Sequence, residues 1–314
     1  MANSKNAYYE IYMINDYFSE GQNGSAIVKK KYKSIHDYCY NGNNSGFGNY
    51  RNYIEMVSCS VIYLLRSLKN MYNLEDDKLA EYAILWLSYK LNKKQKNGGM
   101  NLNDFYTNYI VKNNHYNEKI KSNDSLTYKE IINTKKDLMD MDIKEIFKFN
   151  NPFHILFYLN YVYHDEYLDC TNNSNLAKSF AKQFGELSKD SKNIEESLYN
   201  KMLSTLSDDY NKLKSIFGKK SCNFPSLPKI EPKKIPVVNP EKSSGQPTAL
   251  SSDVISSSSS ISTKLIPALS TFSVIPVFLG IAYKYSLFGI DKIFQRQYLR
   301  KKLKKVKRKM KLNI

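Results

Sequence analysis

Apolar residues recur at helical spacing through most of residues 1–221. In residues 51–71 they fall three or four positions apart, which predicts a long helix central to the core. A second helix is predicted after Asn73, whose side chain suits an N-cap and precedes acidic residues in the first turn. This helix should end within residues 93–99. The apolar series are Ile54, Val57, Val61, Leu64, Leu65 and Leu68, then Leu79, Tyr82, Ala83, Trp86 and either Leu87 or Lys90.

The same pattern predicts further helices. Asn103 suits the cap of a short helix, and Asn151 followed by Pro152 is a typical helix start. No run of residues alternates as a strand would, so the predicted fold class is all-α. The further helices are expected over residues 103–110, 153–168, 176–187 and 198–217.

A long uncharged run lies near the end of the chain. Residues 265–283 (LIPALSTFSVIPVFLGIAY) carry no charge and are long enough to cross a hydrocarbon core of about 30 Å as a helix. The alternative is a buried core helix, but Pro267 and Pro276 would damage the interior of a soluble helix. The run therefore predicts one transmembrane helix over residues 264–288.

Composition changes sharply before this run. Residues 222–263 hold six of the prolines and a run of five serines, and such a segment buries too little apolar surface to fold. The sequence thus predicts four parts, which are a helical domain (1–221), a disordered proline- and serine-rich stalk (222–263), the transmembrane helix (264–288) and a basic cytosolic tail (289–314).

The net charge of +17 is concentrated in that tail. Basic residues that flank a span stay in the cytosol, so the large domain is expected on the other side of the membrane. Leu299, Leu303, Val306 and Met310 form one apolar stripe among the basic residues, which predicts a helix lying on anionic leaflet lipids. The alternative is a solvated tail that only sets topology, and no nucleic-acid partner is expected. The basic tail residues are Arg296, Arg300, Lys301, Lys302, Lys304, Lys305, Lys307, Arg308, Lys309 and Lys311.

Four cysteines precede the apolar run. Cys39, Cys59, Cys170 and Cys222 allow two disulfides in three connectivities, or they are reduced and buried. The first 25 residues contain no apolar core of a signal peptide, so the run at 265–283 would direct insertion.

Residue patterns for catalysis, cofactors or metals are absent from the sequence. The histidines lack the spacing of a zinc site, and His36 near Cys39 has no third group to orient it. The adjacent acids Asp208 and Asp209 point to different helix faces and are expected to be solvated or capping charges. These observations predict a non-enzymatic protein with no cofactor.

Several ordered blocks resemble the Plasmodium interspersed repeat (PIR) proteins, a family of malaria-parasite variant antigens. The resemblance covers essentially the whole chain. It rests on residues 77–91 (DKLAEYAILWLSYKL), 102–106 (LNDFY), 203–210 (LSTLSDDY), 222–225 (CNFP) and 285–291 (YSLFGID). The early cysteine of many family members is absent from residues 1–38.

The resemblance implies a variant antigen at an infected host-cell, parasite or parasitophorous-vacuole membrane, with roles in antigenic variation, immune evasion or host-cell interaction. The alternative is an intracellular membrane-anchored scaffold or trafficking protein. Under the first hypothesis a host receptor or antibody is a partner beside the lipid bilayer. The expected variable surface is the set of connections at residues 41–49, 94–101, 113–124 and 171–175.

Overall fold

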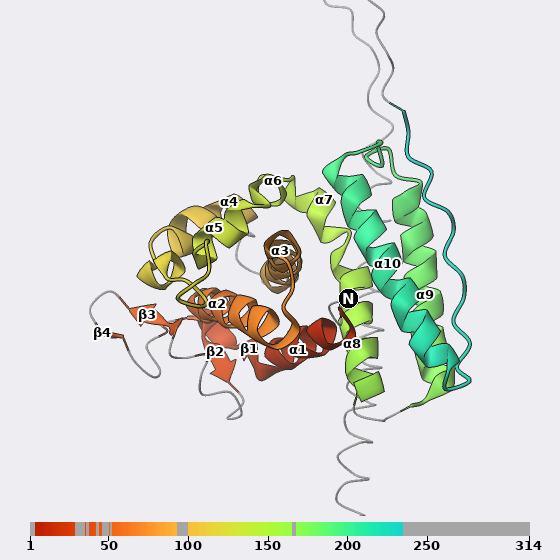
Figure 1. The fold of residues 1–314 in the computed structure, drawn as a ribbon, viewed down its shortest axis with the longest axis horizontal. Helices are drawn as coiled ribbons and strands as arrows, with labels where there is room; N and C mark the ends of the chain where they lie inside the picture. The colour runs from red at the N-terminus through yellow and green to blue at the C-terminus, as the bar shows by residue number, and fades with distance from the viewer. Residues whose placement is uncertain are drawn as a thin grey trace, which may run out of the picture. The chain divides into compact units, whose positions relative to one another are not determined.

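A computed structural model describes residues 4–28, 35, 38–41, 44–45, 50, 52–92, 100–164 and 168–234. Contacts between Cα atoms divide the chain into two units, Met1–Val237 and Val238–Ile314. All the described residues belong to the first unit, and they form a helical domain, as predicted (Figure 1).

The helices of this domain are joined by short connections and two small hairpins. The α-helices are α1 (Ser4–Tyr17), α2 (Tyr53–Tyr72), α3 (Asp76–Asn92), α4 (Leu102–Phe105), α5 (Tyr128–Asn133), α6 (Lys136–Met139), α7 (Ile143–Phe147), α8 (Asn150–His164), α9 (Cys170–Ser188) and α10 (Leu198–Gly218). A π-helical turn, η4 (Tyr106–Ile110), follows α4, and a short 3-10 turn, η5 (Asn114–Asn117), precedes α5. The hairpins are β1–β2 (Phe18–Glu20 and Ala26–Val28) and β3–β4 (Tyr40–Asn41 and Asn44–Ser45).

Helix α3 is the centre of the domain. Viewed down its axis in Figure 1, it is surrounded by α1, α2 and the arc of α4 to α8. Every residue from 79 to 91 is buried, so this helix has no solvent-facing side along that stretch. A helix buried on all sides is apolar over most of its surface, and the polar side chains of this stretch, Glu81, Ser88 and Lys90, form hydrogen bonds within the protein. The apolar stripe read from the sequence therefore covers only one part of the buried surface of α3.

Helix α2 matches the predicted long core helix, but Asn73 has a different role from the one expected. Asn52 caps the start of α2, with its side chain accepting a hydrogen bond from the backbone N–H of Glu55. Asn73 ends α2 in the left-handed conformation (φ 48°) and does not cap α3. Asparagine tolerates this conformation better than most residues, which is why it also serves at helix C-termini.

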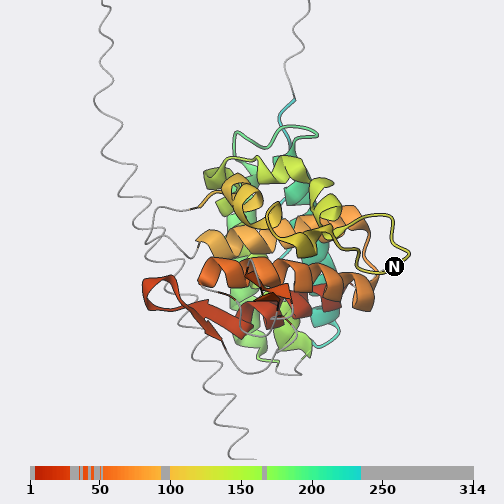
Figure 2. The same ribbon diagram turned by 90° about the vertical axis from the view of Figure 1, so that its left-hand side faces the viewer.

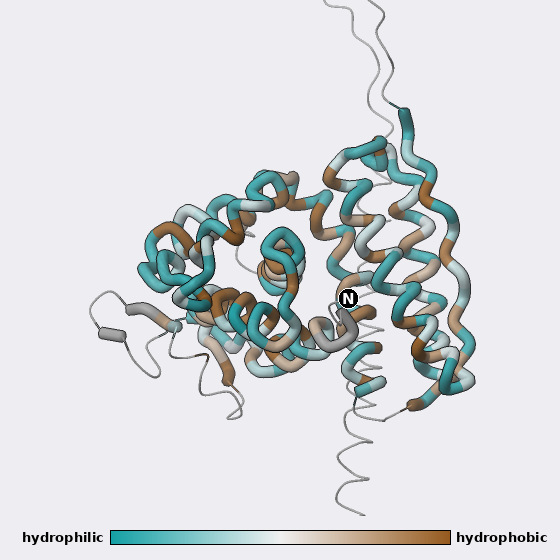
Figure 3. The backbone as a smooth tube through the Cα atoms, in the orientation of Figure 1, coloured by the Kyte–Doolittle hydropathy of each residue, from teal (hydrophilic) through white to brown (hydrophobic). Residues whose placement is uncertain are grey.

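Helices α8, α9 and α10 form the second layer. Figure 3 shows hydrophobic and hydrophilic positions alternating along α9 and α10, as amphipathic helices require. Their inner faces meet through aromatic rings, and Phe180 stacks on Tyr210 with ring centroids 4.6 Å apart. Residues 171–175, expected to be a variable connection, lie inside α9 because Asp169 caps the helix two residues earlier.

Helix α1, the two hairpins and the short helices α5, α6 and α7 were not predicted. Helix α1 buries Ala7, Tyr8, Ile11 and Ile14 at helical spacing, a signal that the sequence does contain. The hairpins, in contrast, have strands of two or three residues, too short for an alternating pattern to be visible. Figure 2 shows the β1–β2 hairpin extending beyond the helices.

The folded domain continues past the expected boundary at residue 221. Cys222 and Phe224 are each 2% exposed, and the chain as far as residue 234 lies on the domain. The proline-rich composition of this segment suggested a stalk, but one disulfide and one buried aromatic ring attach its beginning to the helices.

The predicted membrane segment falls outside the described residues. Among the residues that the structure describes, no helix is long and apolar enough to cross a membrane. The apolar run 265–283 and the basic tail from Arg296 to Lys311 both lie beyond residue 234, outside the described part.

Candidate functional site

The connection between η4 and α5 is an exposed surface that the structure describes along its whole length. Tyr116 anchors its middle, because this fully buried side chain donates a hydrogen bond from its hydroxyl to the carbonyl of Ser58 (2.8 Å). Tyr128 closes the other end, where its backbone N–H donates to the carbonyl of Glu118 (3.0 Å). Between these anchors the exposed residues are Asn117, Glu118, Lys119, Lys121, Ser122, Asn123 and Ser125.

A capping box fixes where this exposed connection ends. The Thr127 hydroxyl oxygen accepts from the backbone N–H of Glu130, and the Glu130 carboxylate accepts from the backbone N–H of Thr127 (2.8 Å). The backbone N–H and the hydroxyl of Thr127 both donate to this carboxylate, and these two hydrogen bonds lower the pKa of Glu130 below its ordinary value. The result is an exposed polar surface of varied charge on a rigid base, which is typical of binding loops. The expected loop at 113–124 is thus described, whereas most of 41–49 and 94–101 is not.

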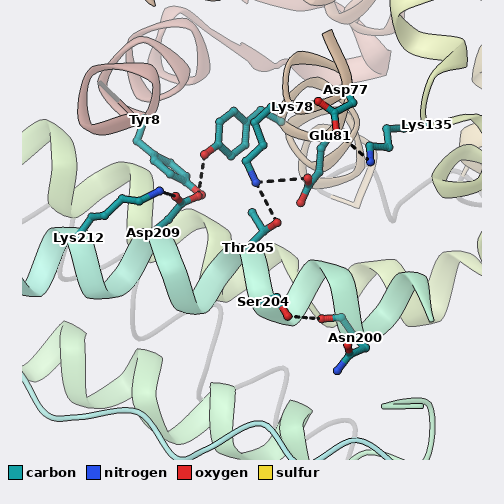
Figure 4. Close-up of polar contacts among 11 residues, drawn as sticks. Tyr8, Asp77, Lys78, Glu81, Lys135, Asn200, Ser204, Thr205, Asp209 and Lys212 are labelled. Atoms are coloured by element: carbon teal, nitrogen blue, oxygen red, sulfur yellow. Dashed lines mark hydrogen bonds and ion pairs between the residues drawn. The ribbon is translucent and has the colours of Figure 1, made fainter. Parts of the chain in front are cut away.

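A buried polar cluster holds the two layers of the domain together (Figure 4). The Asp209 carboxylate on α10 accepts hydrogen bonds from the hydroxyls of Tyr8 on α1 (2.9 Å) and Tyr82 on α3 (2.7 Å). Lys212, one turn further along α10, donates to its other oxygen (3.1 Å). One carboxylate therefore connects three helices that are far apart in the sequence.

The cluster continues along α3 and α10. The Lys78 ammonium donates to the Thr205 hydroxyl (2.9 Å) and lies 3.4 Å from the Glu81 carboxylate. It also lies 5.0 Å from the centre of the Tyr82 ring, within range of a cation–π interaction. Nearer to solvent, the Lys135 ammonium lies 3.5 Å from the carboxylate of Asp77 (Figure 4). These contacts fix the rotation of α3 against α10.

The electrostatics of this cluster favour structural stability over proton transfer. Burial, followed by the negative charge of Asp209, raises the pKa of Tyr8 and of Tyr82 well above the ordinary tyrosine value. Both hydroxyls therefore stay protonated and donate to the carboxylate at neutral pH. Asp209 is 4% exposed, which corrects the expectation that it is a solvated or capping charge. Asp208 is exposed, as expected.

The four cysteines form two disulfides. Cys39 pairs with Cys59 (Cα–Cα 4.9 Å), and Cys170 pairs with Cys222 (Cα–Cα 5.0 Å). The sequence left the pairing open, since the cysteine count alone permits three connectivities. The first disulfide attaches the chain before α2 to that helix, and the second attaches the segment after α10 to the start of α9.

The described histidines pack against aromatic rings. His154 stacks on Tyr89 with ring centroids 5.0 Å apart, and His164 lies 4.9 Å from the Tyr9 ring. His115 bonds Glu118 through Nδ1 (2.8 Å). Within the described ranges, no group of histidine, cysteine and acidic side chains could hold a metal ion. His36, considered with Cys39 in the sequence, lies outside the described residues.

Comparisons with known proteins now identify the family. The family model described as Plasmodium variant antigen protein Cir/Yir/Bir matches residues 8–284. Among solved structures, a Plasmodium PIR protein ectodomain is similar, with a TM-score of 0.53 and 28% sequence identity over 72% of this chain and 100% of that chain. No curated protein matches. With a helical domain like that ectodomain and a family match over most of its length, the chain belongs to the Cir/Yir/Bir family of Plasmodium variant antigens.

Proposed function

We propose that the chain is a non-enzymatic, single-pass membrane antigen that displays its helical domain to the host. The observation that carries this proposal is the family match over residues 8–284. That match spans the folded domain, the proline- and serine-rich segment and the apolar run 265–283 in one continuous stretch. Display would serve antigenic variation, immune evasion or host-cell interaction, with an antibody or receptor as partner.

The two disulfides support a location of the domain outside the cytosol. Disulfides form and persist in oxidising compartments and are rare in the cytosol, where thiols are kept reduced. All four cysteines of the chain are paired in the structure. A domain translocated across a membrane would keep these bonds, whereas a cytosolic domain would lose them.

The alternative is an intracellular scaffold or trafficking protein anchored at an internal parasite or vacuolar membrane. In that case the domain and the basic tail would bind parasite proteins or anionic lipids on internal membranes.

Protease protection on intact infected cells separates the two. One antibody would recognise residues 117–125 and another residues 300–310, and detergent-permeabilised cells would show that both epitopes are cleavable. Display predicts loss of the first signal on intact cells while the second is retained. Protection of both epitopes would support the internal scaffold. Loss of the tail signal alone would contradict the proposed orientation.

A further inference from the structure

After α10 the chain reverses direction and runs back along α9 and α10 as an extended segment, residues 222–234, called here the strap (Figure 1). It begins at Cys222, bonded to Cys170 at the first residue of α9. It ends beside the connection between α9 and α10, where Lys233 pairs with Ile194 in a parallel bridge. The strap therefore moves the point where the chain leaves the domain from one end of these helices to the other.

Side-chain contacts hold the first half of the strap. Phe224 is 2% exposed and stacks on Phe217 with ring centroids 4.6 Å apart. The Tyr210 hydroxyl donates to the carbonyl of Pro225 (2.8 Å), and Pro228 lies over Gly185 of α9.

Backbone contacts hold the second half. The N–H of Lys233 donates to the carbonyl of Asn193 (2.9 Å), and its carbonyl accepts from the N–H of Glu195 (3.0 Å).

Between Phe224 and this bridge, every strap residue is half-buried or exposed. Ordering an extended segment costs conformational entropy at each residue, and this one buries few apolar side chains in return. The disulfide therefore makes the decisive contribution, because it removes freedom that the strap would otherwise gain on release.

The two disulfides differ in their access to solvent. Cys39 and Cys59 are 1% and 2% exposed, so both residues of that bond are buried. In the other bond Cys222 is covered, but Cys170 is only half-buried. Thiol–disulfide exchange requires a thiolate to reach one sulfur atom, and the rate depends on that access. Cys170 is therefore the most exposed of the four cysteines and the position at which a reductant thiolate should attack first.

We propose that Cys170–Cys222 is a redox latch on the strap, opened by a dithiol reductant. The reductant thiolate attacks Sγ of Cys170, the Sγ–Sγ bond breaks, and Cys222 leaves as a thiolate that takes a proton. The second reductant thiol then displaces Cys170 in the same way. The reductant ends as a disulfide and the protein as two thiols, so electrons and protons balance.

Opening the latch releases the strap, residues 222–234, from the helices. Thirteen released residues add up to roughly 40 Å of reach at about 3.3 Å per residue. They also uncover the α9–α10 face that carries Tyr210 and Phe217. The gain in reach matters biologically only if the domain is tethered at its C-terminal side, which rests on the proposed function. The latch itself does not depend on a membrane.

The test uses the full chain in detergent micelles. Dithiothreitol is titrated, free thiols are alkylated with iodoacetamide, and mass spectrometry reads labelling at each cysteine together with Lys-C cleavage after Lys229. We expect Cys170 and Cys222 to be labelled at lower reductant concentration than Cys39 and Cys59. Cleavage after Lys229 should rise at least tenfold over the same concentration range.

Matched variants check the assignment without reductant. Cys170→Ser/Cys222→Ser should show the fast cleavage after Lys229, and Cys39→Ser/Cys59→Ser should show the slow cleavage of the unchanged chain. If a variant loses its helical circular dichroism, the titration of the unchanged chain decides. Labelling of Cys170 and Cys222 without faster cleavage would overturn the proposal, and so would earlier labelling of Cys39 and Cys59. Because the readout is made in micelles, a wrong assignment of the membrane would not change it.

Discussion

Asp209 of α10 links three helices, because its carboxylate accepts hydrogen bonds from the hydroxyls of Tyr8 on α1 and Tyr82 on α3. Replacing it by alanine leaves two buried hydroxyls without their acceptor, and each unsatisfied group costs about 1–3 kcal/mol. We expect Asp209→Ala to lower the free energy of unfolding by about 4 kcal/mol, measured by urea denaturation. The matched control is Asp208→Ala, whose exposed side chain should change stability by less than about 0.5 kcal/mol. Equal effects of the two variants would contradict the role of the cluster.

A second residue-scale prediction concerns pH. Burial raises the pKa of Glu10 above its ordinary value, and a hydrogen bond from Ser67 offsets only part of the shift. Its carboxylate is thus harder to ionise in the folded state than in the unfolded state, so the unfolded state releases this proton first as pH rises. The residue therefore destabilises the fold increasingly between the unfolded and the folded pKa, and the penalty is complete above the folded value.

We expect Glu10→Gln to remove this pH dependence. The difference in melting temperature between the variant and the unchanged chain should grow in favour of the variant from pH 4 to neutral pH. Comparing the two chains at each pH cancels the contributions of other carboxylates. A difference that is flat with pH, or that shrinks as pH rises, would show that Glu10 is not held in a desolvated site.

The role of Asp209 could have been predicted from the sequence in part. It lies three residues after Leu206 and four before Leu213, so the helical period places it on the apolar face of α10, and Asp208 beside it faces away. The helical spacing does not indicate which residue forms a hydrogen bond with Asp209. Tyr8 is 201 positions away and lies in a helix whose existence was not predicted, so only the folded arrangement shows why a carboxylate is tolerated there.

At the scale of elements, Lys90 joins the end of one helix to the side of another. Its side chain is 3% exposed, and its ammonium donates to the carbonyls of Asn15 (2.9 Å) and Phe18 (3.2 Å) at the C-terminal end of α1. The last carbonyls of a helix lack partners within the helix and carry partial negative charge. The buried ammonium of Lys90 on α3 therefore supplies the hydrogen-bond donor that the end of α1 lacks. It also lies 4.1 Å from the centre of the Phe18 ring.

Removing that charge should loosen α1. Lys90→Met keeps the length and apolar stem but leaves two buried carbonyls without a donor, and we expect a loss of about 3 kcal/mol. Hydrogen exchange should show faster opening of α1, with α9 and α10 little changed. Lys144→Met on α7, where the lysine is exposed, is the control and should have almost no effect. Uniform loss of protection across all helices would mean that Lys90 supports the whole core and not α1 in particular.

Elements with one strong apolar stripe were the ones that the sequence predicted well. Helices α2, α9 and α10 have such stripes, and their observed bounds agree with the predicted ranges to within a few residues except at the start of α9. The short helices α5, α6 and α7 have four to six residues each, which is too few for a period to stand out. Their positions depend on packing against α3, which no local pattern encodes.

At the scale of the whole chain, the domain boundary shows where composition misleads. Proline and serine predict a segment that cannot fold alone, and that inference applies to a chain without a surface to bind. Residues 222–234 need no core of their own, because α10 provides the aromatic surface, Tyr210 and Phe217, that covers Phe224. Proline suits such a segment, since it fixes an extended backbone and requires no hydrogen-bond acceptor for its nitrogen. A boundary set from composition alone therefore cuts off part of the domain.

Chains cut at different positions test this boundary. A chain ending at residue 221 lacks Cys222 and Phe224, so it loses the second disulfide and uncovers Phe217. The disulfide contributes about 2–4 kcal/mol and the buried ring about 2 kcal/mol, which together correspond to a melting temperature roughly 10–20 °C lower than that of a chain ending at residue 234. A chain ending at residue 234 with Cys170→Ser/Cys222→Ser should melt close to the chain ending at 221, since loss of the cross-link releases the strap and uncovers Phe217. If the chains ending at 221 and 234 melted at the same temperature, the strap would contribute nothing to the stability of the domain, and the domain would end with α10.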